Sequence, residues 1–176
     1  SMAGTSGPRD FIELPSQLLE HWVSEPEVLK SFAVHYQTGE SIPDELVEKL
    51  LKAAKFNQGF INTEYLAASL LDMDWHTLTK SDILSNSNDF EKKSLKKIGL
   101  IDEIAPRYRS TYFAHIFSGG YSSGYYSYIH AAVLDSDAFE AFKEIGNVFD
   151  SNLSSRLRKE IYEKGSTEEA LSLIHI

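Results

Sequence analysis

The sequence of 176 residues contains no cysteine. This absence excludes disulfide bonds, thiolate metal sites and a cysteine nucleophile. No apolar run approaches the roughly 20 residues that a membrane-spanning helix needs, so no membrane association is expected. The first ten residues have neither a basic start nor an apolar segment, and they do not read as a signal peptide.

Positive charge is also scarce. Lysine and arginine total 17 against 26 aspartate and glutamate residues, which gives a net charge of -9. A nucleic-acid partner is therefore not expected, because an extended phosphate-binding surface needs clustered cations. One short basic run exists, and it is interpreted as the solvated face of a helix. It consists of Lys92, Lys93, Lys96 and Lys97.

Two catalytic motifs are missing as well. None of the six histidines forms an H-x-x-x-H pair, and H-E-x-x-H is absent, so the chain does not build a common zinc site by itself. No G-x-S-x-G turn surrounds Ser118, Ser122 or Ser123, which leaves a serine hydrolase weakly supported. Asp72 and His76 are i,i+4 neighbours, and a surface contact is favoured over a pair of metal ligands.

The composition that remains is that of a globular protein, with 42% hydrophobic and 24% charged residues. Apolar residues recur mostly at helical spacing, which predicts a mainly α-helical body. A short extended segment is considered near residues 111–117, where β-branched and aromatic residues gather. Helices are predicted at about 10–23, from 26, from 43, from 62 to 78, from about 90 to Gly99, at 121–134, from Asp135 or Ser136 to Gly146, and from Asp150 or Ser151 to Gly165. The helix at 62–78 is the longest and is apolar over a wide arc, and its apolar side is expected to carry Leu66, Leu70, Met73 and Leu78.

Residues 115–129 hold most of the candidates for function. His115 precedes a glycine pair, and Tyr121, Tyr125 and Tyr128 follow at i, i+4 and i+7, which predicts one face of a helix. Tyr126 falls off that face. A row of neutral phenols suits a peptide carbonyl or a developing oxyanion. The alternative is an aromatic stripe that is simply core, and composition alone favours this alternative.

Glu13 is the other residue of interest. It lies near a predicted helix start rich in apolar residues, where Asp10 and Glu13 resemble a capping box. The pattern by itself favours a capping carboxylate.

Four blocks carry a resemblance to a known family. Residues 9–22, 56–60, 70–78 and 107–128 resemble successive blocks of the M3 family of zinc metallopeptidases, especially its bacterial peptidyl-dipeptidases and oligopeptidases. The blocks follow the order of the family and cover nearly the whole chain. The resemblance implies the helical part of a zincin-like (gluzincin) catalytic domain. It also implies one Zn²⁺, held by two histidines and a downstream glutamate.

The resemblance assigns roles to individual residues. Glu13 matches the third zinc ligand, which would displace the capping interpretation. His115 and Tyr128 match catalytic residues that stabilise the tetrahedral intermediate, with Tyr128 as the oxyanion donor. These two residues together with Tyr121 and Tyr125 are expected to contact the substrate. The sequence departs from the family at Ser118, where glycine is frequent, and at His130, where tryptophan is usual.

The same resemblance sets expectations for the whole protein. Residues 1–170 are expected to be part of one catalytic domain, with the two histidine ligands and the catalytic glutamate outside this chain. Residues 171–176, LSLIHI, are predicted to be a translated sequencing adapter. The expected activity is removal of C-terminal dipeptides from short unfolded peptides. An oligoendopeptidase of the same family and a helical peptide-binding module remain alternatives. A monomer in the bacterial cytoplasm is expected, with the periplasm as the alternative compartment.

Overall fold

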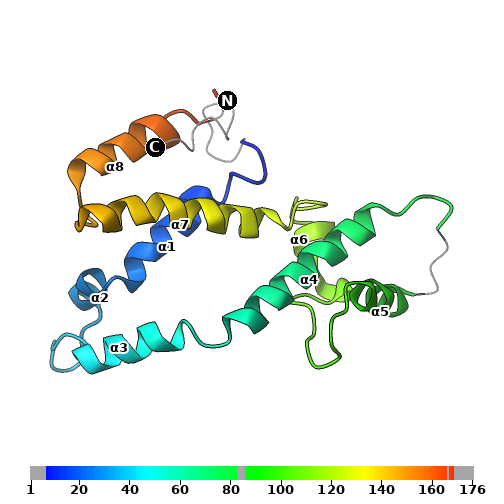
Figure 1. Cartoon of the computed structure of the whole chain (residues 1–176), viewed down its shortest axis with the longest axis horizontal. Coiled ribbons are helices and arrows are strands. Elements are labelled where there is room, and N and C mark those ends of the chain that lie inside the picture. The colour runs from blue at the N-terminus through cyan, green and yellow to red at the C-terminus, as the bar shows by residue number, and fades with distance from the viewer. Residues whose placement is uncertain (1–6, 83–85, 166, 169–176) are drawn as a thin grey trace. The chain divides into compact units, whose positions relative to one another are not determined.

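The computed structural model describes residues 7–82, 86–165 and 167–168 (Figure 1). Within these residues the fold is helical, as predicted, and the only β pairing is an isolated bridge between Val34 and Ser41. The proposed adapter, residues 171–176, lies outside the described residues. The α-helices are α1 (Leu14–Ser24), α2 (Pro26–Phe32), α3 (Asp44–Ala53), α4 (Gln58–His76), α5 (Ser87–Lys97), α6 (Ala114–Phe117), α7 (Ser127–Ile145) and α8 (Ser151–Leu157).

The chain divides into two compact units. Unit 1 combines the residues up to Phe56 with those from His130 onward, and unit 2 comprises residues 57–129. Two short non-α turns complete the helical elements: a 3-10 turn at Ser110–Tyr112 in unit 2 and a π-helical turn at Arg158–Tyr162 in unit 1. None of the helices in the described residues combines the length and apolarity needed to cross a membrane.

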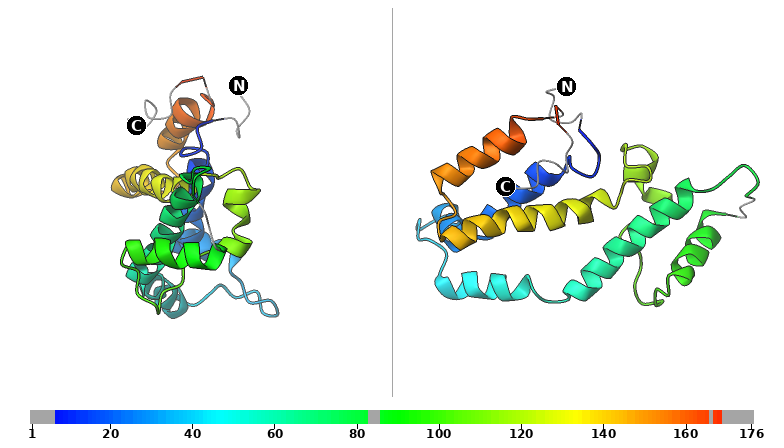
Figure 2. Two further views of the ribbon diagram at one scale, coloured as in Figure 1. Left: turned by 90° about the vertical axis from the view of Figure 1, so that its right-hand side faces the viewer. Right: turned by 45° about the horizontal axis from the view of Figure 1, so that its top comes forward.

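The core of unit 1 joins α1, α7 and α8, and Figure 2 shows α8 running beside α7. Trp22 packs edge-on against Phe139 and Phe142, with ring centroids 4.7 and 5.0 Å apart. Its indole Nε1 donates a hydrogen bond of 2.8 Å to the Val148 carbonyl, so the polar atom of this partly buried side chain is satisfied. The cluster is made of Leu14, Leu18, Phe139, Phe142, Val148, Leu153, Leu157 and Ile161.

Helix α7 is continuous, and the predicted break at Asp135 or Ser136 is wrong. The Asp135 carboxylate does not cap its own helix, because it accepts hydrogen bonds from Gln17 Nε2 at 3.2 Å and His21 Nε2 at 2.8 Å. A buried carboxylate that is paired this way can sit in the middle of a helix. The predicted ends of this region are confirmed: Gly146 follows α7 in the left-handed conformation, and the Asp150 side chain caps α8.

The start of α1 also differs from the prediction. The helix begins at Leu14 with Pro15 in its first turn, and Glu13 occupies the N-cap position without a side-chain capping bond. Asp10 lies outside the helix, and its carbonyl accepts a hydrogen bond of 3.0 Å from His130 Nδ1. The expected capping box is therefore absent.

Unit 2 is built on α4, which packs against α5 and the aromatic segments that follow it. The predicted apolar face of α4 is wrong, because Leu66, Leu70 and Met73 are 53%, 37% and 41% exposed. The buried face instead carries Ala67, Ala68, Leu71 and Asp72. Large rings form the opposite side of this contact, and small alanine side chains let those rings approach the helix closely.

The extended segment considered at residues 111–117 is also wrong, since this stretch forms the 3-10 turn and α6. The side chain of Glu91 holds the start of the turn by accepting a hydrogen bond of 2.7 Å from the Ser110 N–H. Phe113 and Ile116 then turn into the unit 2 core together with Ala68 and Tyr125. Tertiary burial of these aromatic and β-branched residues overrides their local preference for strand.

Candidate functional site

Residues 118–126, called here the tyrosine loop, form a series of turns and not the predicted helix, which begins only at Ser127. Gly120 and Ser123 have φ values of 81° and 54°, in the left-handed region that interrupts a right-handed helix. The backbone at Gly119 lies close to the backbone of His115, because a Cβ atom at Gly119 would lie 2.9 Å from His115 Cα. Only glycine fits at that position without a shift of the backbone.

The loop nevertheless brings the predicted side chains together. The rings of Tyr121 and Tyr128 stack with centroids 5.1 Å apart. The His115 ring lies 6.0 Å from Tyr121 and 6.2 Å from Tyr128. All three side chains are partly exposed, so each keeps an accessible edge. The rings of His115, Tyr121, Tyr125 and Tyr128 are called the tyrosine cluster below.

Tyr125 forms the buried base of the tyrosine cluster. Its side chain is 1% exposed, and its ring stacks on Tyr65 with centroids 5.4 Å apart. Tyr128 packs edge-on against Tyr125 at 5.4 Å. Tyr125 thus supports the more exposed members of the cluster, and its own substrate contact stays a prediction.

Burial controls the ionisation of this pair of phenols. It raises the pKa of Tyr65 to about 12, and it raises the pKa of Tyr125 further above its ordinary value. The nearby Arg107 guanidinium, 4.9 Å from the centre of the Tyr65 ring, opposes the rise in both pKa values. Both groups are consequently neutral at physiological pH, and the base of the cluster carries no charge.

Stability is therefore expected to fall in alkaline solution. The pKa values of Tyr65 and Tyr125 in the folded chain exceed the value of about 10 in the unfolded chain, so the unfolded chain loses these protons first as the pH rises. The contribution of the two neutral phenols to the free energy of unfolding is therefore complete below about pH 10 and is lost as the pH rises above it. Urea unfolding measured between about pH 8 and pH 11.5 should show this decline. The Tyr125→Phe variant should show a shallower decline, whereas Tyr126→Phe, at an exposed position, should follow the parent chain. Identical slopes for all three proteins contradict the assignment.

Glu13 lies in unit 1, in the last position before α1, and its carboxylate accepts a hydrogen bond of 3.1 Å from Ser16 Oγ. Among the described residues, no three histidine, cysteine or acidic side chains come together in a way that could hold a metal ion. Those residues therefore do not form a zinc site on their own. Glu13 supplies one carboxylate, and its assignment as a ligand stays a prediction.

Asp72 is a residue whose importance sequence reasoning missed. The contact predicted at the surface between Asp72 and His76 exists, with 2.8 Å between Oδ1 and Nδ1, but Asp72 is 0% exposed. Its carboxylate also accepts the backbone N–H groups of Ser123 and Tyr125. The available signal was an acidic residue within the wide apolar arc of the long predicted helix, where a buried carboxylate requires partners.

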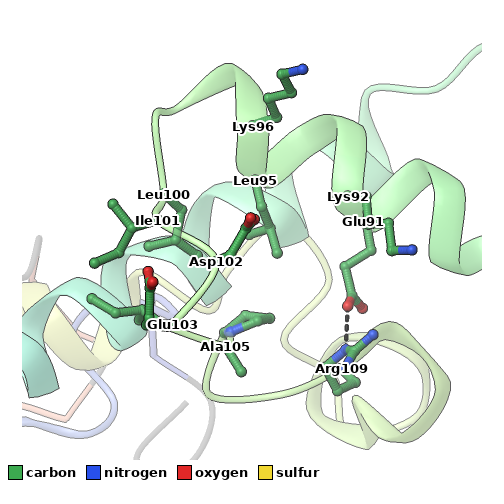
Figure 3. Close-up of a pocket in the computed structure, with 12 residues that line it drawn as sticks. Glu91, Lys92, Leu95, Lys96, Leu100, Ile101, Asp102, Glu103, Ala105 and Arg109 are labelled. Atoms are coloured by element: carbon green, nitrogen blue, oxygen red, sulfur yellow. Dashed lines mark hydrogen bonds and ion pairs between the residues drawn. The ribbon is translucent and has the colours of Figure 1, made fainter.

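A pocket of about 760 Å³ in unit 2 lies between α5 and the segment that follows it (Figure 3). Its wall includes an ion pair between Glu91 and Arg109, and Lys92 and Lys96 lie at its border. None of the predicted site residues lines it. The four lysines of the basic run are all exposed, which confirms the solvated helix face.

Comparisons with known proteins agree with the resemblance. The model of peptidase family M3 matches residues 1–176. The dipeptidyl carboxypeptidase of Escherichia coli (strain K12) is 43% identical over 170 residues, which cover 96% of this chain and 25% of that protein. Oligopeptidase A of the same organism is 35% identical over 173 residues, which cover 98% of this chain and 25% of that protein. Saccharolysin of Saccharomyces cerevisiae is 35% identical over 136 residues, which cover 76% of this chain and 19% of that protein.

The chain spans about a quarter of the length of the bacterial relatives that it matches. The family match extends over the whole of this chain, including the tyrosine loop and Glu13. The chain therefore belongs to peptidase family M3, whose members are metallopeptidases that are generally zinc-dependent.

Proposed function

We propose that this chain is part of a zinc-dependent peptidase that hydrolyses short unfolded peptides, and that it supplies the groups that hold the substrate backbone. The observation that carries the proposal is the gathering of His115, Tyr121 and Tyr128 within about 6 Å of one another, each with an accessible edge. Family membership makes a peptide the expected ligand for this cluster.

The chemistry of the cluster suits amide hydrolysis. A tetrahedral intermediate places negative charge on the former carbonyl oxygen, and a neutral phenol O–H donates a stronger hydrogen bond to that oxyanion than to the carbonyl. Tyr128 is assigned this donor role, and His115 supplies a second polar group beside it. Tyr121 stacks on Tyr128, so it restricts the orientation of the Tyr128 ring and contacts the peptide.

Glu13 is assigned as one zinc ligand of the complete protein. Its carboxylate is a suitable ligand type, while two histidine ligands and the catalytic glutamate would come from a part of the protein outside this chain. When bound, the zinc ion would supply a Lewis acid and an activated water molecule.

The proposed substrate specificity is release of C-terminal dipeptides. Its support is the greater identity to a dipeptidyl carboxypeptidase, 43% compared with 35% to oligopeptidase A, over nearly the same part of the chain. The alternative specificity is that of an oligoendopeptidase, which cleaves internal peptide bonds. Assay of the complete protein with peptides blocked at the C-terminal carboxylate separates the two, because a dipeptide-releasing enzyme needs that carboxylate free. A monomer in the bacterial cytoplasm belongs to the same proposal.

A helical peptide-binding module is the rival function, favoured by the lack of a three-ligand cluster among the described residues. The coding sequence upstream of Ser1 decides between the two. An in-frame H-E-x-x-H motif about two dozen codons before Glu13 would provide the missing ligands and general base. A continuous reading frame without that motif would refute the peptidase and favour the binding module.

The 176-residue chain alone is expected to show no peptide hydrolysis. One carboxylate does not hold zinc at useful affinity, and the sequence contains neither H-E-x-x-H nor a cysteine. The measurement is cleavage of a fluorogenic peptide by the purified chain with and without added Zn²⁺. Turnover that requires zinc and stays with the chain through further purification would overturn both the prediction and the ligand assignment.

A further inference from the structure

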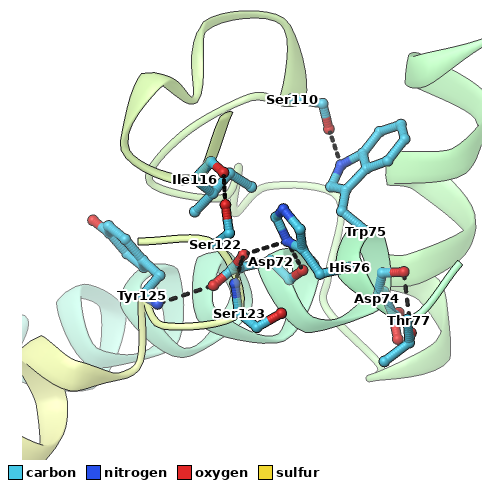
Figure 4. Close-up of polar contacts among 10 residues, drawn as sticks. All are labelled: Asp72, Asp74, Trp75, His76, Thr77, Ser110, Ile116, Ser122, Ser123 and Tyr125. Atoms are coloured by element: carbon cyan, nitrogen blue, oxygen red, sulfur yellow. Dashed lines mark hydrogen bonds and ion pairs between the residues drawn. The ribbon is translucent and has the colours of Figure 1, made fainter. Parts of the chain in front are cut away.

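Asp72 joins α4 to the tyrosine loop through both of its carboxylate oxygens (Figure 4). Oδ1 accepts the Ser123 N–H at 3.0 Å, and Oδ2 accepts the Tyr125 N–H at 2.9 Å. The side chain is 0% exposed and is separated from these partners by about 50 residues of sequence, so it forms a buried tertiary link.

His76 fixes the orientation of this carboxylate. Its Nδ1 lies 2.8 Å from Asp72 Oδ1 and 2.9 Å from the Asp72 carbonyl oxygen. Both neighbours are acceptors, so Nδ1 carries the proton and donates to them. Three donors are therefore directed at the two oxygens of the Asp72 carboxylate, and all three belong to this chain. This arrangement supports a structural link between α4 and the tyrosine loop.

The two backbone amides that donate to Asp72 lie where the tyrosine loop turns, at Ser123 and Tyr125. Ser123 is in the left-handed conformation with φ of 54°, which is uncommon for a residue with a side chain. Tyr125, whose N–H donates the second hydrogen bond to Asp72, lies between Tyr121 and Tyr128 in the sequence. Loss of the link therefore frees the segment that sets the spacing of those two rings.

We propose that Asp72, oriented by His76, is a positioning residue for catalysis, because it fixes the backbone of the tyrosine loop and thereby the placement of the Tyr121 and Tyr128 hydroxyls. The catalytic part of this inference rests on the proposed peptidase function. The link itself does not, because it follows from the contacts of the chain alone. Its chemical basis is that a carboxylate accepts hydrogen bonds at both oxygens, whereas an amide accepts them at only one.

The first experiment measures hydrogen exchange by NMR in the 176-residue chain. In Asp72→Asn, one oxygen remains to accept hydrogen bonds, and the amide NH₂ faces a backbone donor. Exchange of the Ser123 amide, the Tyr125 amide or both should accelerate about 10–100-fold, as expected for loss of a hydrogen bond to a charged group. Amides inside α4 and α5 should keep their rates.

A second variant keeps this test valid if Asp72→Asn does not fold. His76→Ala removes the contact that orients Oδ1, the oxygen that accepts the Ser123 N–H, whereas Tyr125 is bonded to the other oxygen, Oδ2. Because Oδ1 loses its orienting partner, the Ser123 amide should accelerate more than the Tyr125 amide. Unchanged exchange at both amides, or uniform acceleration throughout unit 2, would overturn the positioning role.

The second experiment measures kinetics in the complete protein. Asp72→Asn should lower kcat on the order of 10²-fold, the effect of a displacement of about 1 Å in a catalytic group, with KM changed by less than about twofold. Asp74→Asn is the matched control on the same helix, where the carboxylate is paired with Lys97 at 3.2 Å and does not touch the loop. It should retain the parent kcat.

The two experiments fail in different ways. If the parent complete protein does not cleave peptides, the proposed function is refuted, and amide exchange still decides whether Asp72 holds the loop. If the loop amides accelerate in Asp72→Asn but kcat of an active protein stays the same, the link exists without a catalytic consequence and the proposal of a positioning residue is overturned.

Discussion

Replacing Tyr128 with phenylalanine is expected to lower kcat by about 10²–10³-fold, with little change in KM, in the longer protein that we propose carries this chain. The phenol donates weakly to the substrate carbonyl and strongly to the oxyanion, so its loss raises the energy of the transition state selectively. That loss corresponds to about 2.7–4 kcal/mol. Phenylalanine preserves the ring that stacks on Tyr121 and packs against Tyr125, so the fold should persist.

Tyr126→Phe is the matched control for this variant. Tyr126 belongs to the same loop, but its side chain is 42% exposed and is not a member of the tyrosine cluster. The control should therefore retain the parent kcat and KM. Steady-state kinetics on one peptide substrate gives both parameters. If Tyr128→Phe changes KM alone, then Tyr128 binds the substrate and the transition state equally and is not the oxyanion donor.

Replacing Glu13 with glutamine is expected to remove zinc from the complete protein and to abolish hydrolysis. A carboxylate ligand contributes its negative charge directly to the metal, and the neutral amide does not. Loss of a partner outside the ligand shell already costs about 10–100-fold in affinity, so loss of a ligand should exceed that range. Elemental analysis after dialysis measures the bound zinc, and peptide cleavage measures activity.

Glu20→Gln provides the control for charge on α1. Glu20 is exposed on the same helix, and the substitution removes one negative charge without touching Glu13. Zinc content and activity should both match those of the parent protein. Full zinc occupancy in Glu13→Gln would show that the glutamate is no ligand, and the capping or structural interpretation of this residue would then replace it.

Local sequence determined the helical class and several helix ends. Pro26 begins α2, Gly99 and Gly146 end their helices in the left-handed conformation, and the Asp150 side chain caps α8. These features depend on a few adjacent residues, whose backbone preferences and hydrogen-bonding groups act within one turn. The gathering of His115 with Tyr121, Tyr125 and Tyr128 was also predicted, although the helix invoked to explain it was not found.

Contacts between distant segments decided the rest. Spacing alone placed Leu66, Leu70 and Met73 on the buried face of α4, but the aromatic residues of unit 2 pack instead against Ala68. A 3.6-residue period shows that a helix has an apolar stripe, and it does not specify which partner will cover a helix that is apolar over a wide arc.

The tyrosine loop shows the same division most clearly. The sequence by itself determined which side chains are available there, because phenols, imidazole and glycines are fixed by residue identity. Only the tertiary structure decided how they are presented, because the Asp72 carboxylate accepts the Ser123 and Tyr125 amides from about 50 residues away. A hydrogen bond between such distant segments leaves no periodic pattern in the sequence. The spacing of the tyrosines therefore predicted a helix where the structure has a loop that the buried Asp72 carboxylate holds.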